Sequence, residues 1–123
     1  MTENRYKDWP TEEHARWIKM GHFFGKTLME EVKGYARERI NPTSSLEEKR
    51  AAEKAISDTL YGFMMLLDGV IDSSIDQDHG VEFALVARVF DQNTREYLKE
   101  IELAPGGDGL CMGIHMWEDG EFD

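Results

Sequence analysis

The chain has few of the features on which secreted and membrane proteins depend. Its 123 residues include one cysteine, Cys111, so no internal disulfide can form. The first residues, MTENRYKDWPTEEH, contain no apolar stretch of the kind that a signal peptide carries. The longest nearly apolar run, Leu60 to Leu67, is too short to span a bilayer, which requires about 20 apolar residues. We therefore expect a cytoplasmic protein with no membrane anchor.

Basic residues are scarce in the second half of the chain. Residues 57–123 contain three basic residues, Arg88, Arg95 and Lys99, and fifteen acidic ones, whereas residues 1–56 contain eleven basic and ten acidic residues. The net charge of -11 therefore comes from the second half. A protein with this charge has no general basic surface, so we expect no nucleic-acid partner. Such an asymmetry indicates an interaction surface, although an acidic surface also favours solubility.

Motifs for catalysis and metal binding are also missing. The sequence contains no HExxH, CxxC or glycine-rich phosphate loop, and the acidic segment from Asp72 to Gly80 lacks the spacing of a calcium loop. Cys111 and His115 are four residues apart and would share one face of a helix, but the apolar neighbours of Cys111 favour an inert thiol. The sequence therefore predicts no catalytic residue, no metal and no cofactor. The alternative is a small enzyme or metal-dependent hydrolase that uses acidic and histidine side chains in a cleft.

Two long helices are predicted in the first half of the chain. The first runs from a cap at Asp8 or Thr11 to about Ile40, before an Asn-Pro turn. The second begins at the capping box of residues 45–48 and ends near Leu67. Because the connecting loop is short, we expect the two helices to form an antiparallel hairpin.

The apolar residues of these helices predict how each one packs. Residues 60–67 are apolar at every position but Gly62, which predicts a segment buried on all sides at the centre of the core. The first helix carries an apolar arc made of a main stripe and a shoulder: Trp17, Gly21, Phe24, Leu28, Val32 and Tyr35, with Ile18, Met29, Ala36 and Ile40 beside them. This arc is wider than one neighbouring helix requires. It predicts a homodimer through residues 17–29, and a homo-oligomeric structural protein is therefore a further alternative.

Strand-forming residues predominate after the second helix. Val81–Phe90 is apolar on both faces and rich in β-branched residues, which predicts a central strand. Arg95–Leu103 alternates after a short turn, which predicts an antiparallel hairpin with the first strand. Val70 and Ile71 could begin another short strand, and Leu110–Trp117 fits either one helical turn or a third strand.

The predicted fold class follows from this order of elements. It is α+β, with two long antiparallel helices packed on a small antiparallel sheet, which consists of a hairpin to which residues 110–117 could add a third strand. We expect a single domain over residues 1–123, with loose ends at residues 1–8 and 118–123.

The acidic turns are the predicted binding surface, because loops on a rigid scaffold often carry binding residues. The candidate partner-binding residues are Asp72, Asp76, Asp78, Asp108, Trp117, Glu118 and Asp119. Trp117 is the expected aromatic anchor among them, and the carboxylates predict a partner with a basic protein surface. The sequence therefore favours a non-catalytic, acidic protein-interaction module, such as a small immunity- or inhibitor-type protein.

Overall fold

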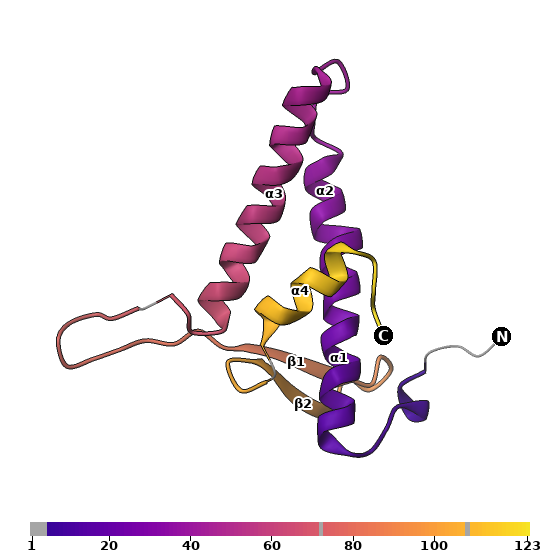
Figure 1. Ribbon diagram of the computed structural model, residues 1–123. Coiled ribbons are helices and arrows are strands. Elements are labelled where there is room, and N and C mark those ends of the chain that lie inside the picture. Colours follow the sequence, from indigo (N-terminus) through magenta and orange to yellow (C-terminus); the bar gives the residue numbers. More distant parts are fainter. Residues whose placement is uncertain (1–4, 72, 108) are drawn as a thin grey trace.

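The computed structural model describes residues 5–71, 73–107 and 109–123. Its helical elements are η1 (Tyr6–Asp8), α1 (Glu13–Thr27), η2 (Leu28–Lys33), α2 (Gly34–Arg37), α3 (Leu46–Leu67) and α4 (Leu110–Glu118). Its strands are β1 (Leu85–Phe90) and β2 (Tyr97–Ala104). This composition confirms the predicted α+β class. The elements α1, η2 and α2 follow one another directly and form one long helix that pairs with α3 in a hairpin (Figure 1).

Side-chain caps fix the starts of both long helices. Glu12 caps α1, in place of the predicted Asp8 or Thr11, by accepting a hydrogen bond from the Ala15 N–H at 2.5 Å. The predicted capping box of α3 is confirmed, because Glu48 N–H donates to Ser45 Oγ at 3.1 Å and Ser45 N–H donates to Glu48 Oε1 at 2.8 Å. The bond from the Ser45 backbone is the main cause of the lowered pKa of Glu48.

A π-helical segment interrupts the apolar stripe of the first helix. The segment η2 places about one additional residue in a helical turn and so rotates the residues that follow it. Gly21, which precedes the segment, and Leu28, at its start, are buried. Val32, near its end, and Tyr35, which follows it, are exposed. The predicted stripe therefore ends at Leu28.

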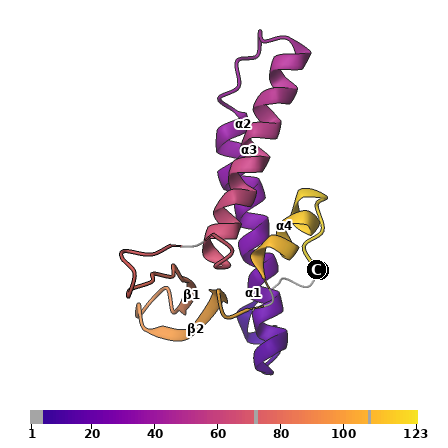
Figure 2. The ribbon, with the colours of Figure 1, turned by 60° about the vertical axis from the view of Figure 1, so that its left-hand side comes forward.

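The core lies at the base of the helical hairpin, where α1, the last turn of α3, β2 and α4 meet. Met64 and Leu67 of α3 are buried, but Phe63 is 53% exposed, so the prediction that this segment is buried on all sides is wrong. The buried apolar residues are Trp9, Met20, Leu28, Met64, Leu67, Ile101, Leu103, Ala104, Leu110, Ile114 and Trp117. The upper halves of the two long helices project away from the sheet (Figures 1 and 2). They have fewer neighbours there, which leaves one side of α3 open.

Residues 110–118 form helix α4, so of the two predicted alternatives, a helical turn or a third strand, the segment is helical, and it is longer than the predicted single turn. Leu110, Ile114 and Trp117 form its buried face at steps of four and three. Trp117 meets the Phe24 ring edge-on, with centroids 5.9 Å apart, and lies so close to Gly25 that a Cβ there would overlap the indole. Helix α4 therefore covers part of the apolar arc of α1, whereas Ile18 is 39% exposed, and the homodimer through residues 17–29 stays a prediction.

The sheet contains two antiparallel strands in the described residues, with Ala87 opposite Ile101 and Val89 opposite Lys99. Alternate residues of β1 are half-buried and exposed, so β1 is an edge strand and not the predicted central strand. Strand β1 begins at Leu85 and not at the predicted residue 81. Leu85 pairs with Ala104, and Pro105, which follows Ala104, has no N–H that could donate to a longer β1. Residues 70 and 71 are outside any strand.

The described residues near each end of the chain pack against the body of the protein. Residues 118–123 are not loose: Glu121 N–H donates to the Met116 carbonyl at 2.9 Å, and Phe122 packs against the core. At the other end, residues 1–4 lie outside the described residues, Tyr6 packs against the core and Trp9 is part of it. In the described part of the chain, no helix has both the length and the apolar character that crossing a membrane requires.

Candidate functional site

The predicted binding residues that the structure describes do not gather on one surface. Asp72 and Asp108 lie outside the described residues. Asp76 and Asp78 belong to the long loop between α3 and β1, whereas Trp117, Glu118 and Asp119 lie at the end of α4. The loop and the end of α4 lie on opposite sides of the molecule in both views (Figures 1 and 2). The two regions therefore have to be considered separately.

Trp117 is not available as an aromatic anchor for a partner. Its side chain is 4% exposed, and its indole N–H donates to His22 Nδ1 at 3.2 Å. The sequence places it beside acidic residues, but the turn of α4 directs its side chain inward, while Met116 and Asp119 are exposed. This residue holds the fold together at the junction of α1 and α4.

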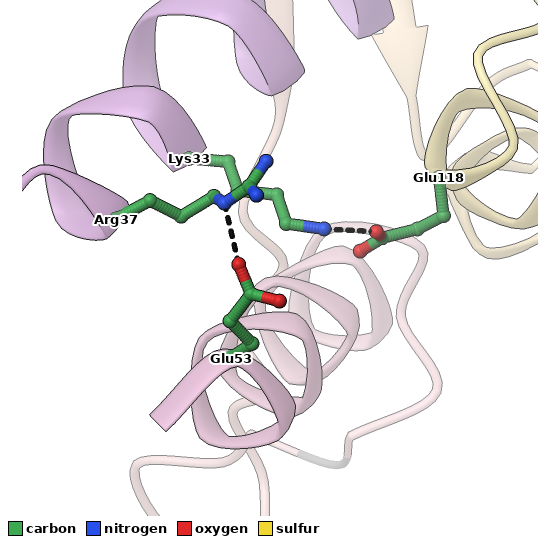
Figure 3. Close-up of polar contacts among 4 residues, drawn as sticks. All are labelled: Lys33, Arg37, Glu53 and Glu118. Carbon is green, nitrogen blue, oxygen red and sulfur yellow. Dashed lines mark hydrogen bonds and ion pairs between the residues drawn. The ribbon is translucent and has the colours of Figure 1, made fainter. Parts of the chain in front are cut away.

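Glu118 is paired inside the protein. Its carboxylate forms an ion pair with Lys33 of η2, and both side chains are partly buried (Figure 3). Close by, Arg37 Nε lies 2.6 Å from Glu53 Oε1, so two ion pairs connect the first helix with α4 and with α3 (Figure 3). Asp119 is exposed and forms the C-cap of α4. Of the acidic residues at this end, Asp119 is thus the one predicted residue that a partner could reach.

The segment between α3 and β1, whose described residues are 70–71 and 73–84 and which we call the arm, projects from the body (Figures 1 and 2). Ser74 and Gly80 form an isolated antiparallel bridge near its tip. Val81 N–H donates to the Ser73 carbonyl at 2.8 Å, and Ile75 N–H donates to the His79 carbonyl at 2.9 Å. The tip is therefore ordered by its own backbone hydrogen bonds.

Asp76 reinforces this turn. Its Oδ1 atom accepts a hydrogen bond from Asp78 N–H at 2.9 Å and lies 2.7 Å from His79 Nδ1. The contact with His79, followed by the bond from Asp78, lowers the pKa of Asp76 below its ordinary value of 3.8. The carboxylate therefore stays charged at neutral pH, and its contribution to the order of the tip is lost as the pH falls below that value.

Ile75 is the apolar residue that the sequence analysis overlooked. At 76% exposure it is the most exposed large hydrophobic side chain in the described part of the protein. It is followed directly by Asp76, which the turn holds in place. The signal in the sequence was a single β-branched residue inside a stretch of Ser, Asp and Gln, where solvation gives no reason for it.

A second overlooked residue, Asp68, joins α3 to α4. It accepts hydrogen bonds from Leu110 N–H at 2.9 Å and Cys111 N–H at 2.8 Å. Gly109 precedes α4 with φ 105 and has no side chain with which to cap it, so the cap comes from the end of α3. Burial is the main cause that raises the pKa of the Cys111 thiol to about 11, and the hydrogen bond and charge of Asp68 add to it.

We expect Cys111 to react slowly with iodoacetamide at neutral pH, with an apparent pKa of about 11 in the folded protein. The folded state favours the neutral thiol. The contribution of Cys111 to the free energy of unfolding is therefore complete below the ordinary thiol pKa and is lost as the pH rises toward 11. Initial alkylation rates, followed by mass spectrometry across this range, test the expectation. Asp68→Asn should lower the apparent pKa only in part, since burial is the larger cause. An ordinary thiol pKa in the folded parent would contradict the geometry.

Acidic and histidine side chains do meet in one groove of about 320 Å³ between α3 and α4. Its lining residues are Ser57, Asp58, Tyr61, Ile114, His115 and Glu118. Asp58 is paired with Lys54 at 2.5 Å, and the His115 ring lies 5.4 Å from the Tyr61 ring. Among the described residues, no hydrogen bond joins His115 to Ser57 or Cys111, and no three His, Cys, Asp or Glu side chains are grouped as metal ligands would be. The groove thus offers no nucleophile–base pair.

Comparisons with protein-family models, with curated proteins and with solved structures found no match to this chain.

Proposed function

We propose that the protein is a non-catalytic interaction module that binds a basic protein surface with its arm. The observation that carries this proposal is the exposed side chain of Ile75 at the tip of a hydrogen-bonded turn, beside the charged Asp76 and Asp78. A side chain held on an ordered loop loses little conformational freedom on binding and can enter a pocket of the partner. Carboxylates next to it would pair with basic residues around that pocket and raise the rate of encounter.

The remainder of the arm supports the same function. Four further large apolar side chains on it are exposed: Val70, Ile71, Val81 and Phe83. Apolar surface of this kind is typical of protein–protein contact sites. The net charge of -11 favours a basic protein over a nucleic acid as the partner. A cytoplasmic immunity- or inhibitor-type protein would have these properties, and its single cysteine suits a reducing compartment.

Site-specific photo-crosslinking tests which surface binds. A photoreactive phenylalanine analogue replaces Ile75 in one variant and Leu46 in another; both side chains are exposed and apolar, but Leu46 lies at the far end of the helical hairpin. We expect cross-linked products in the native lysate that are specific to position 75. Identical products from both positions, or none from position 75, would refute binding through the arm.

The captured partner then allows a test of charge. Asp76→Asn/Asp78→Asn is compared with Asp119→Asn/Glu121→Gln, which removes the same charge at the other end of the molecule. We expect the association rate at low salt to fall only in the first variant, and the difference to shrink at high salt, because the Debye length is about 8 Å at physiological ionic strength. Equal rates for both variants would show that the carboxylates of the arm do not guide binding.

A further inference from the structure

Two methionines and two histidines meet in a groove of about 380 Å³ between α1 and α4. Met112, His115 and Met116 come from α4, and His22 comes from α1. The other described residues of the lining are apolar or glycine: Trp17, Ile18, Gly21, Gly109, Leu110, Gly113 and Trp117. In the described part of the chain the groove therefore offers thioether sulfur and imidazole nitrogen atoms as ligands, and no carboxylate oxygen.

The spacing on α4 places three of these side chains on its outer side. His115 and Met116 follow Met112 by three and four residues, and on a helix such neighbours have Cβ atoms about 5–6 Å apart. Met112 is 72% exposed and Met116 is 37% exposed, so neither side chain is needed to fill the core. Methionine is unbranched and has three rotatable bonds, so both sulfur atoms can turn toward one point in the groove.

The two histidines differ in what their ring nitrogens already bind. The His115 ring packs against the Tyr61 ring, and its nitrogens have no hydrogen-bond partner among the described residues. His22 Nδ1 accepts the N–H of Trp117 at 3.2 Å, and an indole N–H can only donate. The proton of the neutral His22 ring is therefore on Nε2, which leaves neither nitrogen for a metal. His115 is thus the available imidazole ligand.

The surroundings favour a cation, and the ligand atoms favour a soft one. His115 lies in the last turn of α4, where the helix carries partial negative charge, and the net charge of -11 acts in the same direction. Thioethers select Cu(I), and imidazole also suits copper. Magnesium and calcium require oxygen ligands, and structural zinc sites use thiolates, imidazoles and carboxylates.

We propose that α4 carries a three-coordinate site for Cu(I), whose ligands are Met112 Sδ, a ring nitrogen of His115 and Met116 Sδ. Binding replaces the solvent around the ion by these three atoms and transfers no electron. An imidazolium has to release its proton to the solvent before it can bind the metal. The sequence patterns for metal sites contain no thioether, so they miss this arrangement. The site is separate from the arm, and the inference does not depend on the function of the arm.

Silver provides the first test, because Ag(I) is a redox-stable analogue of Cu(I). The titration uses the Cys111→Ser protein, since a thiol would also bind a soft ion; Cys111 does not line the groove. Trp17 and Trp117 do line it, so we expect quenching of tryptophan fluorescence that saturates at one equivalent of Ag(I). Zn(II) should give no saturating change. Anaerobic competition with a coloured Cu(I) chelator then measures the affinity for Cu(I).

Matched double variants identify the ligands. Met112→Leu/Met116→Leu removes both sulfur atoms at nearly constant volume, and Met29→Leu/Met65→Leu removes two sulfur atoms that do not line the groove. In the Cys111→Ser background, we expect the affinity for Cu(I) to fall by about tenfold or more in the first variant and to stay unchanged in the second. Circular dichroism confirms that each variant is folded.

The pH dependence of binding tests the role of His115. We expect the affinity for Cu(I) to fall in acid, because protonation of the imidazole competes with the metal, and His115→Gln should weaken binding and reduce this dependence. A merely structural role of His115 would leave the pH profile unchanged. The absence of saturable Ag(I) or Cu(I) binding to the Cys111→Ser protein would overturn the proposal. So would equal affinities of the two double variants.

Discussion

Replacing Trp117 with alanine is expected to lower the free energy of unfolding by about 3–5 kcal/mol, the range for removing a large aromatic side chain from a core. The indole is 4% exposed and fills the space between Gly25 of α1 and Gly113 of its own helix. It also meets the Phe24 ring edge-on. Because α4 is held at its start by Asp68 and near its end by the Glu118–Lys33 pair, the helix cannot easily move inward to fill the cavity.

The conservative change Trp117→Phe separates packing from hydrogen bonding. It keeps most of the aromatic volume but removes the N–H that donates to His22 at 3.2 Å. We therefore expect the free energy of unfolding to fall by a smaller amount, about 1 kcal/mol for the lost hydrogen bond. Chemical denaturation at one fixed protein concentration measures both variants, since association would make stability depend on concentration. If Trp117→Ala lost less than about 1 kcal/mol, α4 would not be part of the core.

The second large effect is expected at Leu67. Leu67→Ala should lower the free energy of unfolding by about 2–5 kcal/mol, whereas Phe63→Ala, one turn earlier on α3, should lower it by less than about 1 kcal/mol. Both residues belong to the same apolar run, but Leu67 is 6% exposed and Phe63 is 53% exposed. The comparison therefore tests burial and not hydrophobicity alone. Equal losses at the two positions would mean that the outer side of α3 is also covered.

These two residues also show what the sequence could and could not predict. A capping box and a tight turn depend on neighbours in the chain, so both were predictable: the capping box at Ser45 is present, and Asp91 accepts hydrogen bonds from Thr94 and Asn93, which lower its pKa. The start of α1 was not predicted correctly, since its cap is Glu12 and not Asp8 or Thr11. The buried side of residues 60–67 was not predictable. When every position is apolar, periodicity carries no direction.

Helix α4 was ambiguous for a related reason. A short apolar segment fits a helix or a strand equally well, and the choice depends on residues far away in the sequence. Asp68 caps the helix from α3, and Gly25 on α1 leaves room for Trp117. Neither contact can be recognised from the sequence of residues 110–117 alone.

The candidate site was predicted in part. The composition showed that carboxylates concentrate in the second half of the chain, but not which of them are already paired. Glu118 binds Lys33, which is 85 residues away, whereas Asp76 forms its bonds inside the arm. A charge count cannot distinguish these cases, because only the fold brings Lys33 to the end of α4.

The π-helical segment η2 has a consequence for evolutionary comparison. A homologue with a regular α-helix at this place would have one residue fewer between Leu28 and Lys33, so its alignment with this chain requires a one-residue gap inside a helix. An alignment that forbids the gap would rotate the second half of the helix by about 100° relative to the first. The position of Lys33 would then be equated with that of an outward-facing residue. A search for homologues should therefore treat residues 13–27 and 33–37 as two blocks joined by a variable spacing.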